Sequence, residues 1–223
     1  MSVGIEIHPS KYADPNLVKA FKGLPTSVVS DVVGRLLGTT GLLPINKSIV
    51  SVCGNAVTVK VRAGDNLLIH KALQILKPGD VLVVDGEGDT TRALVGEIMM
   101  TIAKTNGAVG FVMDGAVRDV DAFEEHHFPC WARGVNLRGP YKEGPGTINQ
   151  AITVGGMLVN PGDIILGDSD GIVAIGASDA QEILNLANKK MAQEKEMISS
   201  ILNGSYDDQW VDETLKIKGF KNA

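Results

Sequence analysis

The sequence predicts one layered α/β domain with a central mixed sheet, a β-rich second half and a helical C-terminal arm. Residues 79–113 read as a strand, an amphipathic helix and a second strand, which is the unit of a parallel sheet. Residues 148–175 then contain several short apolar runs separated by Gly, Pro and Asp turns. A long charged helix is expected from Ser178 to Asn203. We therefore expect an α/β domain over residues 1–177 and a C-terminal helical arm over residues 178–223.

The individual elements follow from periodicity and turn residues. The stretch "LPTSVVSDVVGRLLG" (24–38) has apolar residues at helical spacing, with Thr26 or Ser27 as N-cap. The stretch "GFVMDG" (110–115) reads as a buried strand that turns at its Asp-Gly pair. The other expected elements are a strand at 56–61, an N-capped helix at 64–76, a helix at 95–107 capped by Gly107, a helix at 120–128, a strand at 129–133, a hairpin turn at "GDSDG" (167–171) and a helix at 207–219.

Composition excludes several classes of function. The formal charge is −5, and Lys and Arg are scattered rather than clustered, so nucleic acid is not expected as a direct partner. No stretch approaches the roughly 18 consecutive apolar residues of a membrane helix. Cys53 and Cys130 stand alone, which favours a reducing compartment. The protein is expected to be cytoplasmic, without a membrane partner.

The stretch "GFVMDGAVRDVDAF" (110–123) carries the chemistry. Arg118 stands directly before Asp119, and because neighbours along a chain rarely pair well, each is expected to contact a different group. Glu97 precedes Arg118 by twenty residues, about one helix plus one strand. That spacing can bring both to the carboxyl edge of a parallel sheet, where α/β folds form their ligand crevice.

These residue types suit a small anionic keto acid bound to a metal. The first turn of a helix offers free N–H groups to a carboxylate, and Gly96 would allow close approach to the backbone of Ile98 and Met99. Arg118 would grip a carboxylate or keto oxygen through its planar fork. Asp119 and Glu97 supply hard oxygen donors for Mg²⁺ or Mn²⁺.

Each candidate also has a plain structural interpretation. Asp119 could cap the helix that follows it, Arg118 could form a surface salt bridge, and Glu97 could be a first-turn acid favoured by the helix dipole. The paired histidines, His126 and His127, point to different faces of a helix and are expected to be structural or surface residues and not metal ligands. His70 is expected in the core or as a cap, with the rim of the crevice as the alternative. The "DGEGD" run (85–89) is expected to form a lip of the crevice.

The stretch "LVGEIMMTIAKTNGAVGFVMDGAVRDV" resembles the signature of class II 4-hydroxy-4-methyl-2-oxoglutarate/4-carboxy-4-hydroxy-2-oxoadipate aldolases, in which a Gly-Asp/Glu pair, twenty residues and Arg-Asp follow one another. Further matches in the expected order are "FPCWARG", "LVNPGDIILGDSDGIVAI" and "AQEKEM". The resemblance covers roughly residues 25–223. It implies a lyase that releases pyruvate from a 4-hydroxy-2-oxo acid with a divalent metal, and it implies oxaloacetate decarboxylation as a side activity.

The resemblance also implies roles for individual residues. Arg118 would hold the pyruvate unit, Asp119 would bind the metal directly, and Glu97 would hold metal-bound water. The backbone amides of Ile98 and Met99, beyond Gly96, would receive the pyruvate carboxylate. A neighbouring subunit would donate a glutamate from its C-terminal arm, best aligned with Glu194, with Glu196 as its rival. The site would then exist only in an oligomer, a homotrimer or homohexamer.

A related branch of the same fold family comprises regulators of an RNase, and this leaves a non-catalytic binding protein as the alternative function. That branch replaces the acid after the arginine and lacks the long C-terminal helix, whereas this chain keeps both. Many members of the aldolase family carry Asp where this chain has Glu97. A related oxo-acid decarboxylase is a third possibility. The substrate's distal carboxylate could be bound by Arg35, Arg62 or Arg92, and the sequence does not choose among them.

Overall fold

The computed structural model describes residues 4–48 and 51–220. Its helices are α1 (Pro15–Phe21), α2 (Thr26–Val32), α3 (Leu67–Leu73), α4 (Glu97–Thr105), α5 (Val120–Glu125), α6 (Ala180–Leu202) and α7 (Gln209–Ile217). Its strands are β1 (Ile5–Ile7), β2 (Leu43–Pro44), β3 (Val52–Val61), β4 (Asp80–Asp85), β5 (Ala93–Val95), β6 (Gly110–Val117), β7 (Cys130–Val135), β8 (Gly146–Ile148), β9 (Ile152–Val154), β10 (Met157–Val159), β11 (Ile164–Asp168) and β12 (Gly171–Ile175).

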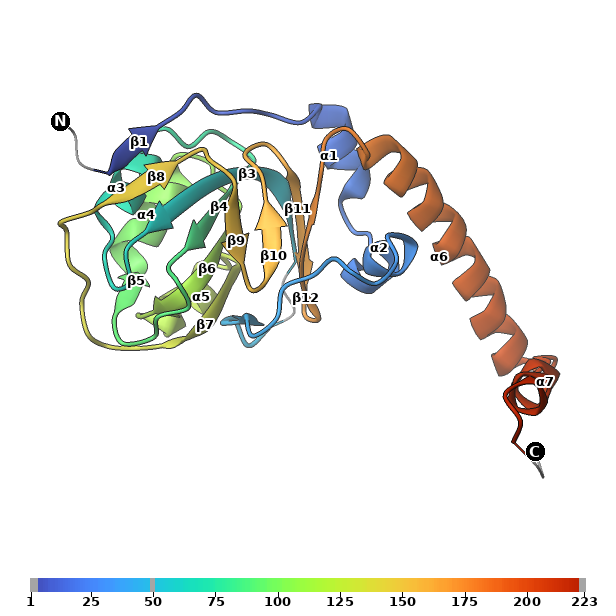
Figure 1. The fold of residues 1–223 in the computed structure, drawn as a ribbon. Coiled ribbons are helices and arrows are strands. Elements are labelled where there is room, and N and C mark those ends of the chain that lie inside the picture. Colours follow the sequence, from blue (N-terminus) through green and yellow to red (C-terminus); the bar gives the residue numbers. More distant parts are fainter. Residues whose placement is uncertain (1–3, 49–50, 221–223) are drawn as a thin grey trace.

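One mixed sheet organises the molecule, as the sequence predicts (Figure 1). Strands β3, β4, β6 and β7 run parallel in its centre, and the short β5 also pairs in parallel with the end of β6. Strands β8 and β11 join β3 antiparallel, and β11 continues into β12 through the predicted hairpin turn. Strands β9 and β10 form a separate hairpin.

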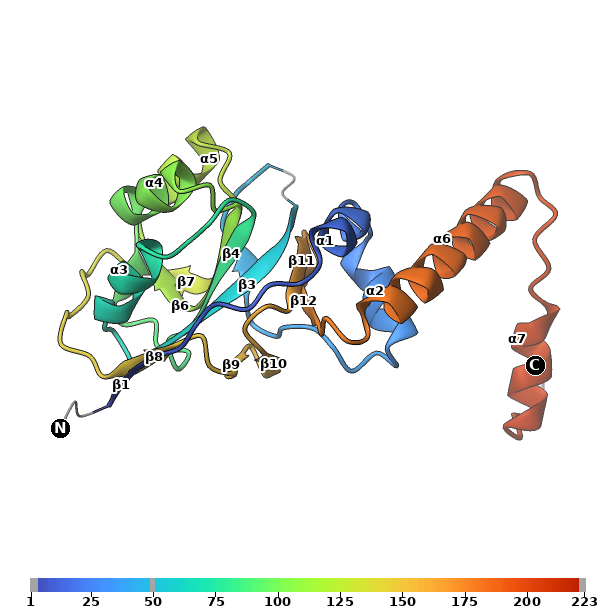
Figure 2. The same ribbon diagram turned by 90° about the horizontal axis from the view of Figure 1, so that it is seen from above.

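The two faces of the sheet bury different sets of side chains. Helices α3, α4 and α5 cover one face (Figure 2), where the rings of Phe111, Phe123 and Phe128 pack edge-on or tilted against one another. The opposite face packs Trp131 against residues of the β9–β10 hairpin. A third cluster joins α1, α2 and the first half of α6 to β11 and β12. Central strands buried on both faces explain the continuous apolar runs in the sequence.

Several boundaries differ from those predicted. Helix α2 ends at Val32, not near residue 38, because Gly34 and Arg35 both have positive φ angles (79° and 61°). Its N-cap is Pro25, and the Thr26 hydroxyl instead donates to the Asp168 carboxylate at 2.7 Å, so the prediction of a Thr26 or Ser27 cap is wrong.

Strand β6 also differs, because it does not turn at Asp114-Gly115 but continues to Val117. The Asp114 carboxylate is buried there, pairs with Arg133, and accepts the N–H of Gly155 at 2.7 Å. Satisfied in this way, an Asp-Gly pair can remain inside a central strand. The predicted C-terminal cap of α4 is confirmed, because Gly107 has a φ of 87° and donates to Lys104.

The outer half of α6 extends away from the sheet and ends at α7, on the side opposite α3 and α4 (Figures 1 and 2). Ala180, Ile183, Leu184 and Ala187 in its first half are buried, whereas Met197, Ile198, Ile201 and Leu202 are half or more exposed. Within residues 4–48 and 51–220, no helix is both long enough and apolar enough to span a membrane.

Candidate active site

The ends of β5 and β6 place the two predicted motifs side by side. These strands pair in parallel, with Val95 opposite Val117, so Gly96-Glu97 and Arg118-Asp119 leave the same edge of the sheet. The backbone N–H of Arg118 donates to the Val95 carbonyl at 3.0 Å. The convergence predicted from the twenty-residue spacing is present. Strand β5 itself was not predicted, because its three residues are too few to show a period.

Gly96 is required for space rather than for backbone conformation. Its φ of −153° is available to any residue. A β-carbon at this position, however, would collide with the Asp119 carboxylate and lie 2.9 Å from Cγ of Arg118. The glycine therefore lets the loop after β6 pack directly against the start of α4.

Asp119 adopts a left-handed conformation, with φ 56° and ψ 44°, which is uncommon for a residue other than glycine. It occupies the N-cap position of α5, yet its side chain makes no capping hydrogen bond there. Oδ2 instead accepts the backbone N–H of Glu97 at 3.1 Å. The capping interpretation is therefore wrong, and the strained residue presents its carboxylate to the first turn of α4.

Arg118 and Asp119 contact each other, contrary to the expectation that each would meet a different group. Nε of Arg118 lies 3.6 Å from Oδ2 of Asp119, because the left-handed turn folds the carboxylate back toward the arginine. Both side chains are more than 40% exposed, so this pair contributes little stability and leaves the guanidinium available to a ligand.

The first turn of α4 supplies further donors. The first intrahelical hydrogen bond runs from Met100 N–H to the Gly96 carbonyl, and the Glu97 N–H is used by Asp119. The N–H groups of Ile98 and Met99 have no carbonyl of their own helix to reach, since they precede the first full turn. Both residues line a pocket with Arg118 and Asp119. The helix dipole adds a partial positive charge there.

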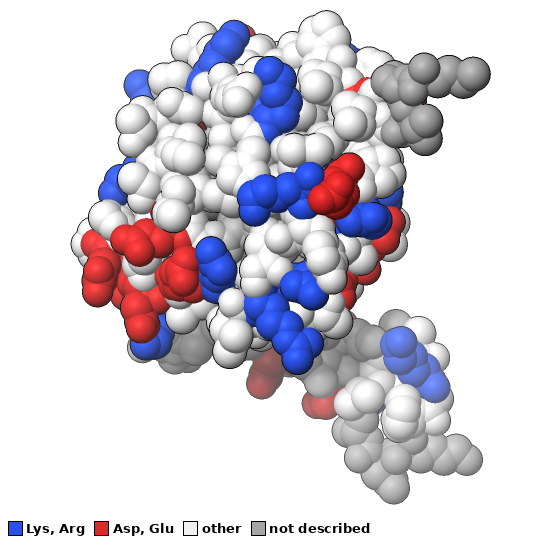
Figure 3. Space-filling model, turned by 90° about the vertical axis from the view of Figure 1, so that its left-hand side faces the viewer, with Lys and Arg blue, Asp and Glu red and all other residues white. Residues whose placement is uncertain are grey.

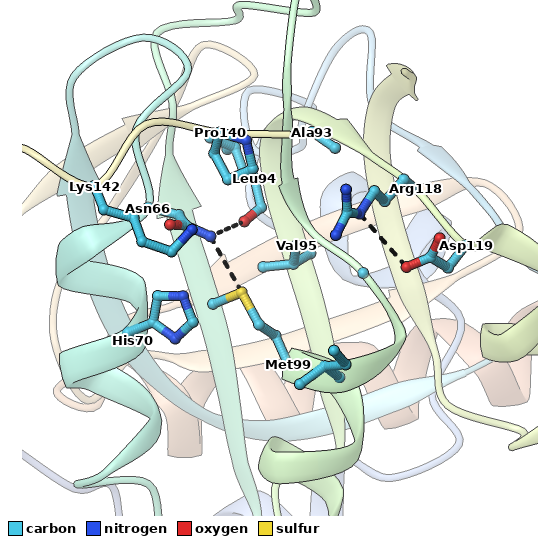
Figure 4. Close-up of a pocket in the computed structure, with 12 residues that line it drawn as sticks. Asn66, His70, Ala93, Leu94, Val95, Met99, Arg118, Asp119, Pro140 and Lys142 are labelled. Atoms are coloured by element: carbon cyan, nitrogen blue, oxygen red, sulfur yellow. Dashed lines mark hydrogen bonds and ion pairs between the residues drawn. The ribbon is translucent and has the colours of Figure 1, made fainter. Parts of the chain in front are cut away.

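This cavity, which we call the main pocket, holds roughly 240 Å³ and opens between α3, α4 and two loops (Figure 4). Arg118 and Asp119 lie on one side, and Asn66, His70 and Lys142 lie on the other. His70 therefore reaches the pocket, the alternative that the sequence left open. Burial and, secondarily, the charge of Lys142 lower the pKa of the His70 imidazole, so the ring is neutral near pH 7.

A second depression adjoins the main pocket and shares Asp119 with it. Its acids are Glu97, Asp119, Asp121 and Glu125, and we call it the acidic hollow. Figure 3 shows acidic side chains gathered on the α4–α5 side of the molecule, beside a band of Lys and Arg. The Asp119 carboxylate thus has the Arg118 guanidinium on one side and the other acids of the hollow on the other.

The donor set fits a magnesium-type ion and not a closed protein cage. No cluster of three or more His, Cys, Asp or Glu suitable for a metal occurs in the described part of the chain. Mg²⁺ commonly uses one or two carboxylates and keeps several waters. Asp119 and Glu97 can supply those two carboxylates, and Oδ1 of Asp119 has no protein partner within the described residues.

Other residues singled out in the sequence lie elsewhere. Glu194 and Glu196 lie on α6, and Glu194 pairs with Lys190 at 3.4 Å, so neither joins the main pocket within one protomer (Figure 1). Arg35 pairs with Asp31, and His126 and His127 are exposed as predicted. Lys142 was missed, because it lies in an irregular loop that only the folded chain brings to α3.

Fold and site together define an α/β protein in which the first turn of a helix, an arginine and two acidic residues meet at the carboxyl edge of a mixed sheet. Residues 26–174 match the model of the RraA-like family, described as Aldolase/RraA. The chain belongs to this family. It is 40% identical over 184 residues, 82% of this chain and 87% of the other, to a Halalkalibacterium halodurans protein named "Putative 4-hydroxy-4-methyl-2-oxoglutarate aldolase".

Solved structures give the same fold. A Streptomyces coelicolor protein, RraAS2, described as an unusual member of the RNase ES inhibitor RraA family, superposes with a TM-score of 0.76 at 27% identity, over 84% of this chain and 98% of that one. An uncharacterized Pseudomonas syringae protein reaches a TM-score of 0.78 at 23% identity, over 87% and 96% of the two chains. The family therefore contains proteins named as aldolases and proteins named as RNase inhibitors.

Proposed function

We propose that this protein is a divalent-metal-dependent pyruvate aldolase. It would cleave a 4-hydroxy-2-oxo acid, such as 4-hydroxy-4-methyl-2-oxoglutarate or 4-carboxy-4-hydroxy-2-oxoadipate, to pyruvate and a second oxo acid. The observation that carries the proposal is the meeting of Glu97, Arg118 and Asp119 at one sheet edge, beside the free N–H groups of Ile98 and Met99. The name of the 40% identical relative supports it.

The substrate's 2-oxo acid end would bind between α4 and the loop after β6. The N–H groups of Ile98 and Met99 would receive its carboxylate, and Arg118 would donate to the 2-keto oxygen. Asp119 would hold the metal directly and Glu97 through water. Bound there, Mg²⁺ or Mn²⁺ would act as a Lewis acid that favours negative charge on the keto oxygen.

Cleavage requires a proton to leave the C4 hydroxyl and one to arrive at C3. As the C3–C4 bond breaks, its electron pair moves toward the 2-keto group, and Arg118 shares the developing negative charge. A water held by Glu97 would accept the hydroxyl proton and later protonate C3. Oxaloacetate would lose carbon dioxide through the same charge distribution, so we expect its decarboxylation as a side activity.

Assembly would complete the site. Glu194 of a neighbouring subunit would orient the same water, in a homotrimer or homohexamer. The exposed apolar residues of the outer half of α6 support such an arrangement, since the protomer itself leaves them uncovered.

A binding protein that regulates an RNase is the second candidate, favoured by the likeness to RraAS2. The left-handed Asp119 favours the enzyme, because backbone strain that aims a carboxylate at a helix start has no use in a purely adhesive surface.

Pyruvate release from both candidate substrates and from oxaloacetate, coupled to lactate dehydrogenase, tests the proposal. We expect release with Mg²⁺ or Mn²⁺ and none with a chelator. If none of the three compounds releases pyruvate, the aldolase proposal is wrong and the RNase-regulating binding protein becomes the favoured function.

A further inference from the structure

The backbone of Arg118 is held more firmly than its side chain. Among the residues that the structure describes, the guanidinium meets one acid, Asp119, at 3.6 Å from Nε. The peptide group between Val117 and Arg118, by contrast, is bound on both sides. Its N–H donates to the Val95 carbonyl, and its carbonyl accepts the N–H of Asn136, both at 3.0 Å. The position of the arginine therefore depends on what holds Asn136.

The Asn136 side chain joins two loops at the carboxyl edge of the sheet. The residue directly follows β7. Its Nδ2 donates to the Thr90 carbonyl at 2.8 Å, in the loop that leads from β4 to β5. Its Oδ1 accepts the N–H of Arg138 at 2.9 Å, in the loop that leads from β7 to β8. Because an asparagine amide carries both donors and an acceptor, this one side chain serves both loops at once.

The β7–β8 loop packs against the Arg118 guanidinium. A β-carbon built on Gly139 would lie 3.6 Å from Nη1 of Arg118, so the backbone of this glycine lies beside the guanidinium. Pro140, the next residue, lines the main pocket (Figure 4). The Arg138 carbonyl accepts the N–H of Ala93 at 2.8 Å, which ties the loop to the start of β5. The loop thus forms one side of the space that the guanidinium occupies.

Arg92, one of the arginines considered for a distal carboxylate, instead holds the far end of this loop. It donates to the Gly139 carbonyl and to the Tyr141 hydroxyl, both at 2.8 Å. Its guanidinium also lies 4.1 Å from the centre of the Tyr141 ring. The segment beside Arg118 is therefore fixed on one side by Asn136 and on the other by Arg92.

We infer that Asn136 is a positioning residue for Arg118. It does not line the main pocket itself. It holds the peptide group before Arg118 and the loop at Gly139 in a fixed relation, so that the guanidinium faces the keto oxygen of a bound 2-oxo acid. The inference rests on the proposed function for the reaction that Arg118 serves. Because negative charge on the keto oxygen grows as the C3–C4 bond breaks, a displaced guanidinium costs more in the transition state than in the ground state.

The Nε–H signal of Arg118 in ¹H–¹⁵N NMR spectra reports the placement of the guanidinium without any substrate. It is the signal that Arg118→Lys removes. Asn136→Ala should shift or broaden it. Asn136→Asp keeps the acceptor for the Arg138 N–H and sets an oxygen against the Thr90 carbonyl, so it should perturb the signal as well. Agreement between the two variants excludes a folding defect peculiar to one of them.

Asn106→Ala is the matched control. Nδ2 of Asn106 also donates to a backbone carbonyl at 2.8 Å, that of Leu73, and this bond ties the end of α4 to α3. Its loss should leave the Arg118 signal unchanged. An Arg118 signal that stays in place in both Asn136 variants, or that moves equally in Asn106→Ala, would overturn the positioning role.

Pyruvate release gives the functional readout. In Asn136→Ala we expect kcat to fall about tenfold or more, with a smaller change in KM. In an Arg118→Lys background the same substitution should change kcat less than about twofold, because the group that it positions is already gone. Losses that multiply fully in the double variant would contradict the inference. If the wild type releases no pyruvate, the aldolase proposal alone fails, and the NMR comparison decides the role of Asn136.

Discussion

At position 96 the absence of a side chain allows the start of α4 to pack against Arg118 and Asp119. Gly96→Ala would push its methyl group into the Asp119 carboxylate, and Asp119 would have to leave Glu97 N–H. We expect kcat/KM for pyruvate release to fall about a hundredfold, the cost of misplacing a catalytic group by roughly an ångström. Thermal unfolding should change little, because the collision lies at a partly exposed edge.

Gly134→Ala is the control for that substitution. A β-carbon at Gly134 would meet only Cγ2 of Thr90, at an ordinary 3.6 Å. Activity should be retained. Full activity in Gly96→Ala would show that the close packing of α4 against Asp119 is unimportant for catalysis.

The electrostatic interaction between His70 and Lys142 can be measured through the pKa of the His70 imidazole. Burial is the larger cause of the low His70 pKa, and the charge of Lys142 is the second. Removing that charge in Lys142→Met should therefore raise the pKa of His70 toward 6.5 without fully reaching it. NMR titration of the imidazole is the measurement, and an unchanged or lower pKa would show that the two groups do not interact.

Strand β6 continues through an Asp-Gly pair that normally favours a turn, because contacts distant in sequence stabilise it there. The buried Asp114 carboxylate ties β7, through Arg133, to the β9–β10 hairpin, through Gly155. Asp114→Ala would leave the guanidinium without its partner, and we expect the free energy of unfolding to fall by about 3 kcal/mol. Urea denaturation at fixed protomer concentration would measure it.

An exposed ion pair provides the comparison. Lys47 and Asp121 lie 3.6 Å apart with more than 80% of each side chain exposed. Asp121→Ala should leave stability nearly unchanged. Equal effects of the two substitutions would contradict the assigned role of Asp114.

The same elements show what the sequence could predict. The β4–α4–β6 unit could be predicted from the apolar periodicity of its elements, and the convergence of Glu97, Arg118 and Asp119 from their spacing along the chain. The early end of α2 could not be predicted in this way, because the positive φ angles at Gly34 and Arg35 leave no mark on the apolar periodicity of the sequence. The position of Lys142 in the pocket could not be predicted either, since its loop reaches α3 through hydrogen bonds from Glu143 and Gly144 to Asp65, which is distant in the sequence.

At the scale of the whole molecule, the extended arm is the main feature that one protomer does not explain. The outer half of α6 and helix α7 leave large apolar residues such as Leu202, Trp210 and Ile217 exposed. We propose that a neighbouring copy covers this surface and that its pocket receives Glu194.

Subunit complementation tests that assignment. Glu194→Ala and Asp119→Ala should each be nearly inactive alone. Mixed oligomers, formed by unfolding and refolding the two together, should regain activity, because some interfaces then combine an intact Asp119 with an intact Glu194. Glu196→Ala should remain active. No recovery in oligomers shown by mass spectrometry to be mixed would place each site within one protomer or assign the arm another role.

The central claim is that Arg118, Asp119 and Glu97 together allow pyruvate to lose a methyl proton, whichever 4-hydroxy-2-oxo acid is the natural substrate. Deuterium incorporation into the pyruvate methyl group in D₂O, followed by NMR, measures that step without a choice of substrate. The account predicts exchange with Mg²⁺ or Mn²⁺, none with chelator, loss of exchange in Asp119→Asn and retention in Asp121→Asn. Metal-loaded wild-type protein that leaves the methyl group unexchanged, or exchange that survives in Asp119→Asn, would contradict it.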